Sequence, residues 1–416
     1  MAESIGAKKQ STCSELRGEI NATVHLLGGR SSMRLVIVRR EAGVALSMDV
    51  YADNLVAELK AIRPNWEIIE VAPQPWSKTQ ENLWHSGTGI RKYYERYWHH
   101  PQQVCQVEGD IYHIIDHTNA HVAYWLKKKG KPIIITCHDL VPFVYPEILK
   151  GQSRFPAFSM ASWQFSVKGM CYANCVIAVS SNTAKDAHER LGITLDKIVV
   201  VPNGVEASFQ PLPSEEIKYS RQKYQRYPEE ICLLNVGSTH QRKNIITVLK
   251  VLKTLKQRGL LVRLWRCGGK FTPEQIDFIK EHNLEQDILD FGIANQNILI
   301  QLYNAADVLL APSLYEGFGL TVIEAMACGL PVITSNVSSI PEVAENAAIM
   351  LNPMDIKSMA SAIYHLHINP VYRKQLIDQG LLRSKSLTWK RTSEQIALNY
   401  EKLIGFVPQR LTETIF

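Results

Sequence analysis

The sequence predicts an α/β protein built from two doubly wound domains that face a central cleft. Short apolar runs alternate with helical patterns twice over along the chain, which is typical of parallel sheets covered by helices. A polar stretch with prolines and charges, 210–230, separates the two series and is interpreted as an interdomain linker. The chain has 416 residues, which is enough for two domains of ordinary size.

The first half predicts one domain, 33–211, after a leader, 1–32, that has no hydrophobic periodicity and is expected to be disordered. Apolar runs predict its buried strands at 35–38, 66–71, 111–115, 132–136, 175–181 and 198–201. A loop that contains Gly43 follows the first run and leads into a helical pattern. After the run 175–181, Asn182 or Thr183 can cap a helix over 184–191.

The second half predicts another domain, 212–390, with strands at 231–237, 262–269 and 308–311. Helical patterns follow from Ile245 and again over 356–366 and 375–400. Because strands and helices alternate as in the first half, the same doubly wound arrangement is expected.

One stretch of the second half, 312–332, combines a turn with the start of a helix. The turn contains Gly317 and Gly319, and good helix formers follow from Leu320 until Gly329 and Pro331 end the element. Glycines let the backbone approach a ligand, and the unpaired N–H groups of a helix start favour an anion. The stretch therefore predicts a phosphate-binding turn.

Two carboxylates of this stretch, Glu316 in the turn and Glu324 in the helix, are too far apart to share one proton or one metal ion. A carboxylate beside a phosphate is tolerated where it accepts hydrogen bonds from neutral donors, such as the hydroxyls of a hexose or a ribose. Two surface acids are the simpler interpretation of a glutamate pair alone. The flanking Gly-Phe-Gly and Ala-Met-Ala-x-Gly-x-Pro-Val sequences favour the binding role.

Two further clusters follow predicted strands. Gly237 ends one strand, and Arg242 and Lys243 come just before the next helical pattern, so that two cations and a helix start can neutralise a diphosphate leaving group. A solvated basic loop is the simpler alternative. In the first domain, His138 and Asp139 follow the strand 132–136, and the carboxyl ends of parallel strands face the ligand crevice.

The stretch 312–332 resembles the signature of the retaining nucleotide-sugar glycosyltransferases with the GT-B fold, of the glycosyltransferase family four type. Pro-Ser-x-x-Glu-Gly-Phe-Gly and the second glutamate with its Ala-Met-Ala-x-Gly-x-Pro-Val context carry the resemblance, which extends over 33–405. It implies two Rossmann-like domains, the first on the acceptor side and the second binding the nucleotide sugar. It also implies a final helix, 391–416, that crosses back to the first domain after Trp389.

The resemblance assigns roles to the residues of the stretch 312–332. Glu316 is expected to contact the donor sugar and Glu324 the ribose, while Phe318, Gly319 and Leu320 offer backbone amides to the diphosphate.

The resemblance also assigns roles elsewhere in the chain. Lys243 matches the family's lysine before a helix, and Arg242 its arginine partner in an Arg-Lys-Asn run, although many members carry that arginine where this chain has Ser238. His138 is expected near the donor sugar. Gly43 is expected to approach the donor phosphate, unless it is a plain loop glycine. The loop that ends at Ile293 is expected to hold the base through backbone groups.

The implied reaction is transfer of a hexose from a nucleoside-diphosphate sugar to an acceptor hydroxyl of a glycan, glycolipid or small polyol, with retention at the anomeric carbon. The chain has no Asp-x-Asp motif and no evident covalent nucleophile, so we expect no metal and no cofactor, and attack from the leaving-group face. A non-catalytic sugar-nucleotide-binding protein and a GT-B epimerase or phosphorylase stay as alternatives. A dinucleotide oxidoreductase is disfavoured, because Gly87-Thr88-Gly89 follows no strand and Lys92 replaces the third glycine.

The composition indicates the kind of partner and the cellular location to expect. The net charge of +6 suggests anionic substrates or an acidic surface, and no apolar run approaches the roughly 18 residues of a membrane span. We therefore expect a cytoplasmic protein, with its eight cysteines reduced and buried and without metal spacing.

The segment 76–100 mixes tryptophan and tyrosine with cationic side chains. It suits peripheral contact with the inner membrane surface or the acceptor, or ordinary packing. A nucleic-acid partner is not expected.

Overall fold

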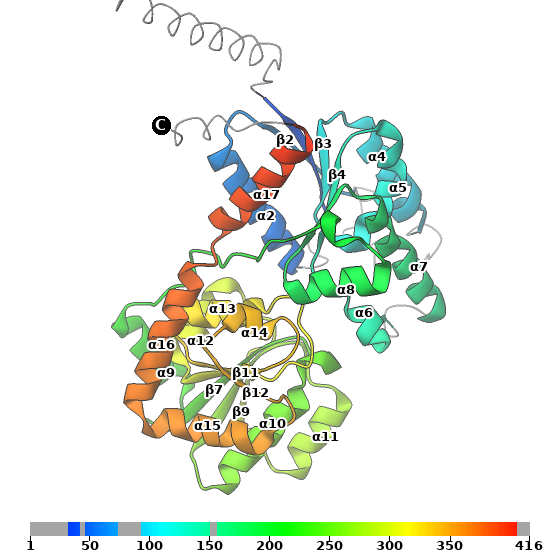
Figure 1. Ribbon diagram of the computed structural model, residues 1–416. Helices are drawn as coiled ribbons and strands as arrows, with labels where there is room; N and C mark the ends of the chain where they lie inside the picture. Colours follow the sequence, from blue (N-terminus) through cyan, green and yellow to red (C-terminus); the bar gives the residue numbers. More distant parts are fainter. Residues whose placement is uncertain (1–31, 42–45, 74–92, 150–155, 406–416) are drawn as a thin grey trace, which may run out of the picture.

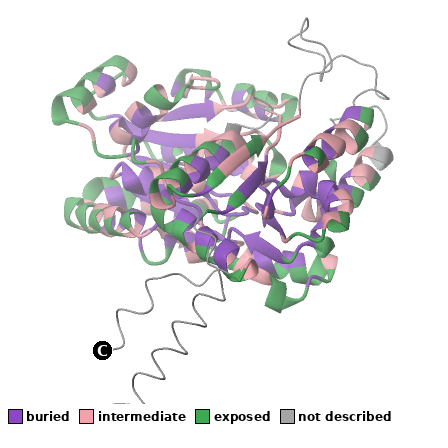
Figure 2. Cartoon of the chain, turned by 90° about the horizontal axis from the view of Figure 1, so that it is seen from above, coloured by how far each residue is buried: buried purple, intermediate pink, exposed green. Residues whose placement is uncertain are grey.

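The computed structural model describes residues 32–41, 46–73, 93–149 and 156–405 (Figure 1). These residues form two α/β domains, each with a six-stranded sheet in which every strand pair is parallel, as the sequence predicts. Figure 2 shows that the strands are buried between helices whose outer faces are exposed. Each domain is therefore a sheet covered by helices on both faces.

The first sheet has the order β2-β1-β3-β4-β5-β6. The order in which strands are added therefore reverses between β1 and β3. Its strands are β1 Arg34–Val38, β2 Glu67–Val71, β3 Ile111–Ile114, β4 Ile133–Cys137, β5 Cys175–Ala178 and β6 Ile198–Val200. The covering α-helices are α2 Leu46–Ile62, α4 His100–Gln106, α5 Ala123–Leu126, α6 Val141–Val144, α7 Pro156–Lys168 and α8 Ser181–Leu191. Short helical turns join them: η1 Glu95–His99, η2 His117–Val122, η3 Lys127–Lys129, η4 Pro146–Leu149, η5 Gly169–Tyr172 and η6 Leu195–Lys197.

The second sheet has the order β12-β11-β10-β7-β8-β9, and the reversal lies between β7 and β10. Its strands are β7 Ile231–Gly237, β8 Val262–Gly268, β9 Ile288–Asp290, β10 Val308–Ala311, β11 Val332–Ser335 and β12 Ile349–Leu351. Its helices are α9 Ser214–Tyr224, α10 Ile245–Gln257, α11 Pro273–Glu281, α12 Gln296–Ala305, α13 Leu320–Ala327, α14 Ile340–Ala344, α15 Ile356–Ile368 and α16 Pro370–Lys385, with the turns η7 Gln241–Lys243 and η8 Glu285–Asp287.

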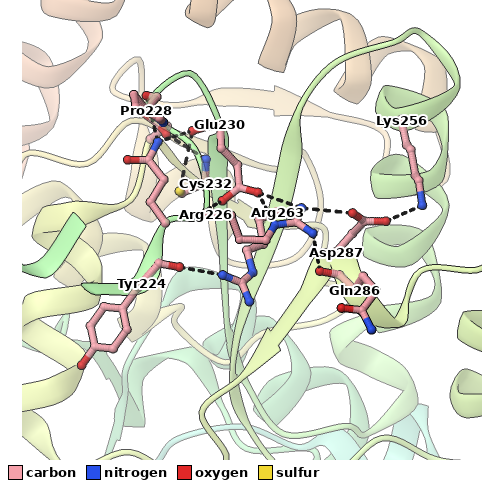
Figure 3. Close-up of polar contacts among 11 residues, drawn as sticks. Tyr224, Arg226, Pro228, Glu230, Cys232, Lys256, Arg263, Gln286 and Asp287 are labelled. Atoms are coloured by element: carbon pink, nitrogen blue, oxygen red, sulfur yellow. Dashed lines mark hydrogen bonds and ion pairs between the residues drawn. The ribbon is translucent and has the colours of Figure 1, made fainter. Parts of the chain in front are cut away.

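The polar stretch 210–230 is more than a linker, because α9 forms within it and packs on α12 of the second domain. Arg221 of α9 donates two hydrogen bonds to Asp307, at 3.0 and 3.1 Å. Figure 3 shows how the end of this segment is held: Arg226 bonds both Glu230 and Asp287, and Lys256 bonds Asp287 as well. The mostly polar composition of this stretch concealed a helix that is held by ion pairs and by packing of Tyr224 on Trp265 and Phe291.

The final helix, α17 Trp389–Leu403, leaves the second domain and packs against α2 of the first (Figure 1). Its buried side chains Trp389, Ile396 and Tyr400 join the same apolar cluster as Leu35 of β1 and Tyr51 of α2. Arg63 after α2 also donates to Glu401 at 2.7 Å. The end of the chain therefore completes the core of its beginning.

Two local expectations are corrected by the structure. The cap of α8 is Ser180, whose hydroxyl accepts from the backbone N–H of Thr183, rather than Asn182 or Thr183. Seven of the cysteines lie in the described residues and all are free, but Cys171 is exposed and Cys105 half-buried, so burial is not general. No described helix is long and apolar enough to cross a bilayer.

Candidate functional site

The candidate site lies where the strand order of the second sheet reverses. β7 and β10 are neighbours there, and the loops that follow them border the crevice in which doubly wound domains bind ligands. The two loops are joined directly, since Leu314 N donates to the Arg242 carbonyl at 2.7 Å and the Asn244 amide donates to the Pro312 carbonyl at 3.0 Å. The loops therefore act as one rigid piece.

Glu316, Arg242 and Lys243 form a buried ion-pair cluster in these loops. Arg242 donates to one carboxylate oxygen at 2.7 Å and Lys243 to the other at 2.6 Å, while the Ser313 hydroxyl donates at 2.8 Å. Burial alone would raise the pKa of Glu316, but Lys243 and Arg242 lower it to about 2. Two cations and one ionised acid leave the cluster with a net positive charge, which suits an anion.

The backbone of Glu316 is fixed by two serines that precede α14. The Ser338 hydroxyl accepts from Glu316 N at 3.1 Å, and both Ser338 and Ser339 donate to the Glu316 carbonyl, at 2.7 and 2.9 Å. Ser339 also lies 2.9 Å from the Phe318 carbonyl. The sequence analysis did not identify these serines, because nothing in their spacing indicates that they hold the turn.

Gly317 lies against the first domain. A Cβ added to Gly317 would come within 1.9 Å of the His138 carbonyl oxygen and 2.9 Å of Asp139 Cβ. The Gly317 carbonyl accepts from the hydroxyls of Ser180 and Thr183, at 2.6 and 3.1 Å. The described structure thus gives this glycine a role in the contact between the domains.

Other contacts also join α8 to the second domain. The Glu342 carboxylate accepts from the backbone N–H groups of Ser181 and Asn182, at 2.8 and 3.1 Å. The Tyr315 hydroxyl donates to Asp186 at 2.5 Å. With Gly317, these bonds hold the two domains together across the start of α8, which lies between them in Figure 1.

Gly319 caps α13 with a φ of 106°, a left-handed conformation that disfavours a side chain. Phe318 is buried and packs with Val179 of the first domain and Ile323 of α13, and Leu320 lies against the same cluster. The strand, glycine turn and helix predicted from the sequence are therefore present. The backbone contacts of Phe318, Gly319 and Leu320 with a diphosphate stay a prediction.

Glu324 lies half-buried on α13, apart from the Glu316 cluster. The Tyr303 hydroxyl of α12 donates to its carboxylate at 2.8 Å. Burial raises its pKa to about 7, although the Tyr303 bond lowers it. The two glutamates of the motif therefore differ in charge state, as different roles require, and Glu324 titrates near neutral pH.

His138 and Asp139 follow β4 and lie beside Gly317, so the structure brings them to the predicted cleft. The His138 Nε2–H donates to the Ile115 carbonyl at 2.8 Å, and burial lowers the pKa of the ring. A neutral ring of this tautomer leaves Nδ1 as an acceptor. Asp139 accepts from Val141 N at 3.2 Å, and it helps to raise the pKa of Arg242, which burial alone would lower.

The other predicted site residues lie at the edges of this cleft or outside the described residues. A Cβ on Gly237 would come 3.2 Å from Cε of Lys243, so the lysine side chain runs over the end of β7. Ile293 is 85% exposed and follows Gly292, whose carbonyl accepts from Gly268 at the end of β8. Gly43 lies in 42–45, outside the described residues, and its donor contact stays a prediction.

Two family comparisons cover both domains. The family described as "Glycosyltransferase Family 4" matches residues 48–209, and the family described as "Glycosyl transferases group 1" matches residues 216–383. Together they span more than half of the chain. The chain belongs to the GT-B glycosyltransferases of the family four type.

Curated relatives agree with this assignment. The glycosyltransferase is 27% identical over 317 residues to "Serotype-specific mannosyltransferase WbdA" of Escherichia coli, which is 72% of this chain but 38% of the relative. It is 26% identical over 285 residues to "O-antigen chain mannosyltransferase B" of Escherichia coli, covering 68% of this chain and 73% of the relative. The chain thus spans little more than a third of WbdA.

Solved structures show the same fold. Anabaena Alr3699/HepE in complex with UDP and glucose superposes with a TM-score of 0.69 at 17% identity, covering 89% of this chain and all of that one. Sucrose-phosphate synthase from Thermosynechococcus elongatus gives a TM-score of 0.68 at 19% identity over 90% of this chain and all of that one. The predicted GT-B fold is confirmed.

A buried cation of the glycosyltransferase escaped the sequence analysis. Arg266 of β8 is fully buried and donates to the Gly237 carbonyl at 2.6 Å and to the Cys267 carbonyl. Its Nε has no partner, and no described carboxylate lies within ion-pair distance. A buried guanidinium without a paired acid is costly, and this one lies beneath the glycines that end β7 and β8. The sequence feature that could have identified this buried cation is an arginine inside an otherwise apolar strand.

The first domain of the glycosyltransferase has its own charged cluster at the reversal between β1 and β3. Asp116 accepts from Arg40 at 3.2 Å and from Thr118 N at 2.8 Å. Burial would raise the pKa of Asp116, but His117 and Arg40 lower it to about 2. Arg40 directly precedes the loop that contains Gly43. Within the described ranges, no cluster of His, Cys, Asp and Glu is arranged to hold a metal ion.

Proposed function

We propose that this glycosyltransferase moves a hexose from a nucleoside-diphosphate sugar to an acceptor hydroxyl of a glycan, glycolipid or small polyol, with retention at the anomeric carbon. The observation that carries the proposal is the cationic Glu316–Arg242–Lys243 cluster beside the start of α13. HepE, a structural neighbour, was solved with UDP-glucose, and several relatives are named mannosyltransferases. A nucleotide-sugar donor fits these neighbours and the charge of the cluster.

In the proposed reaction, the bond between the anomeric carbon and the diphosphate oxygen breaks while the acceptor oxygen bonds the same face of that carbon. The acceptor proton passes to the departing phosphate oxygen, and the products are the glycoside and a nucleoside diphosphate. Arg242 and Lys243 stabilise the negative charge that develops on the leaving group. No covalent intermediate and no metal ion is required.

The protein groups around the sugar have complementary hydrogen-bonding roles. Glu316 is ionised and accepts only, and its two cations can turn toward the diphosphate while Ser313 keeps one carboxylate oxygen bonded. The neutral His138 offers Nδ1 as an acceptor from the opposite domain. Such acceptors suit sugar hydroxyls, which are neutral donors.

A donor panel tests this proposal. The full chain is incubated with UDP-, GDP- and ADP-hexoses, with and without a mixed set of hydroxyl acceptors, in the presence of EDTA. We expect one donor to release its nucleoside diphosphate faster with acceptor, and NMR of the product to show the anomeric configuration of the donor. Binding without turnover would support a sugar-nucleotide-binding protein, and an epimerised or phosphorolysed product would support those alternatives.

Donor affinity should depend on pH through Glu324. The pKa of this carboxyl is raised to about 7, and only the ionised form accepts hydrogen bonds from both ribose hydroxyls. As the pH falls from 8 to 5.5, the ionised fraction falls by roughly 30-fold, so the Kd for UDP or GDP should rise by at least about tenfold. Calorimetric titration across this range measures the effect.

Glu324→Gln is the control for this pH dependence. It keeps the shape and removes the titration, while the phosphate of the ligand titrates equally in both proteins. We expect weak and nearly pH-independent binding by the variant. Identical pH profiles for the two proteins would show that Glu324 does not bind the donor.

Arg266 should strengthen donor binding by its charge. In Arg266→Gln the positive charge beneath the diphosphate is lost, and the Kd for UDP or GDP should rise about tenfold, the effect of a charge pair roughly 12 Å apart at an effective dielectric of about 20. Arg266→Lys keeps the charge and should stay within about threefold of the wild type. The Tm of each unliganded variant shows whether the substitution disturbs the fold. If both variants lost affinity equally, and in proportion to their fall in Tm, Arg266 would have only a structural role.

The predicted membrane contact through 76–100 also stays a proposal, as does a cytoplasmic location. Residues 74–92 lie outside the described residues. In the described part, Trp98 is half exposed, whereas Glu95 and His100 are buried. Of its described residues, 93–100, only Tyr94 and Trp98 are exposed.

A further inference from the structure

The first domain carries a surface that combines exposed aromatic side chains with unpaired lysines. It is formed by α5 with η3, by α7 with η5, and by η1; α5 and α7 lie on the same side of the first domain in Figure 1. The exposed aromatic residues are Trp98 at 50%, Phe165 at 51% and Tyr172 at 45%. We call these residues, with Lys127, Lys128 and Lys168, the aromatic–lysine surface.

The aromatic rings of this surface are in contact with one another. Tyr124 of α5 packs on Phe165 with ring centroids 5.0 Å apart and on Tyr172 at 5.1 Å. Trp98 meets Trp125 at 5.0 Å. Tyr97 of η1 also packs on Phe165, at 5.7 Å, so aromatic rings from three separate parts of the chain meet at this surface. The sequence segment 76–100 supplies only one of the exposed members.

The charged residues of this surface are all positive. Lys127, Lys128 and Lys168 are exposed, and the Lys127 ammonium lies 4.2 Å from the Tyr172 ring centroid. No Asp or Glu occurs over 117–131 or 156–185, the stretches that carry these lysines. Ordinary protein surfaces mix both signs of charge, and an unbalanced cationic face attracts an anionic partner.

We infer that the aromatic–lysine surface docks on an anionic phospholipid bilayer. Aromatic rings with apolar bodies and polar edges partition to the membrane interface, and lysines beside them attract acidic headgroups. Nucleic acid would fit the charge, but it would need rings free to stack on bases, and three of these rings pack on each other. The inference is independent of the proposed reaction and extends the membrane contact from Trp98 of the segment 76–100 to α5, η3, α7 and η5.

Vesicle flotation of the full chain tests the inference. We expect binding to vesicles of 30% phosphatidylglycerol in phosphatidylcholine at 50 mM salt, weak binding to pure phosphatidylcholine, and loss of binding as salt rises. Each lysine near the surface contributes roughly a fivefold change in partition. The triple variant K127Q/K128Q/K168Q should therefore lose about 100-fold.

A matched triple variant, K218Q/K385Q/K390Q, makes the same charge change at exposed lysines elsewhere and should lose less than about fivefold. Phe165→Ser should weaken binding several-fold, whereas Tyr219→Ser, at an exposed aromatic residue of α9, should not. Equal losses in the two triple variants, or no binding of the wild type at low salt, would overturn the inference. If the protein bound single-stranded DNA through the same lysines and did not bind vesicles, the partner of this surface would be nucleic acid and not a bilayer. Donor turnover is measured in parallel, so failure here does not touch the proposed reaction.

Discussion

Lys243→Ala lowers kcat with the nucleotide-sugar donor by roughly 10² to 10³-fold, the usual cost of removing one donor that stabilises a developing oxyanion. Lys243 bonds Glu316 at 2.6 Å and runs over Gly237 at the end of β7, so its ammonium is aimed at the crevice. Arg242 still pairs with Glu316 in the variant, at 2.7 Å, so the loop keeps a buried ion pair and the fold should survive. Single-turnover kinetics at saturating donor measure the chemical step.

The control for this prediction is Lys256→Ala, which removes a lysine–carboxylate contact with Asp287 far from the crevice (Figure 3). It should leave kcat within about twofold, because an exposed ion pair contributes little even to stability. Wild-type turnover in Lys243→Ala would show that other groups stabilise the diphosphate. The roles proposed for the Glu316–Arg242–Lys243 cluster would then be wrong.

Gly317→Ala also abolishes most activity, by roughly 10²-fold or more, while leaving each domain folded. The new Cβ would lie 1.9 Å from the His138 carbonyl oxygen, a backbone atom that cannot rotate away. The domains must separate by more than about 1 Å, and a displacement of that size at a reacting centre can cost about 10²-fold. The bonds from Ser180 and Thr183 to the Gly317 carbonyl are strained at the same time.

Small-angle scattering and kinetics together check this expectation. We expect a larger radius of gyration, a kcat/KM that falls, and a far-UV spectrum like the wild type. Gly380→Ala is the matched control, since the nearest atom to its Cβ is Cγ of the flexible Met326 side chain, at 3.2 Å, and the Met326 Cα lies at 3.5 Å, an ordinary contact distance. A fully active Gly317→Ala enzyme with unchanged dimensions would mean that the described domain contact is not needed for the reaction.

The sequence predicted the fold well because buried parallel strands leave long apolar runs. Val308–Ala311 and Ile231–Gly237 were visible in this way, and the glycines and helix formers after Val308–Ala311 located α13. β12 was missed, since Ile349–Leu351 is a short edge strand that is only half-buried. The helix α9 was missed because its sequence is mostly polar and shows no apolar periodicity.

The sequence identified the residues of the site better than their contacts. Glu316, Arg242 and Lys243 were each predicted, but their pairing joins residues 73 and 74 positions apart and needs the strand order to be known. Tyr303 reaches Glu324 from another helix, and the Ser338 and Ser339 bonds depend on how α14 packs. Contacts between elements follow from topology, which periodicity alone does not reveal.

The return of α17 has a consequence for how this protein is made. Tyr400 and Trp389 fill the same interior as Tyr51, with Tyr51 and Trp389 rings 5.3 Å apart. A ribosome releases the amino-terminal half before these side chains are made, so the apolar face of α2 stays uncovered until residues 389–403 have been synthesised. The first domain therefore does not correspond to one uninterrupted stretch of the sequence, and a dissected amino-terminal fragment should be soluble only when residues 389–403 are supplied as a separate peptide.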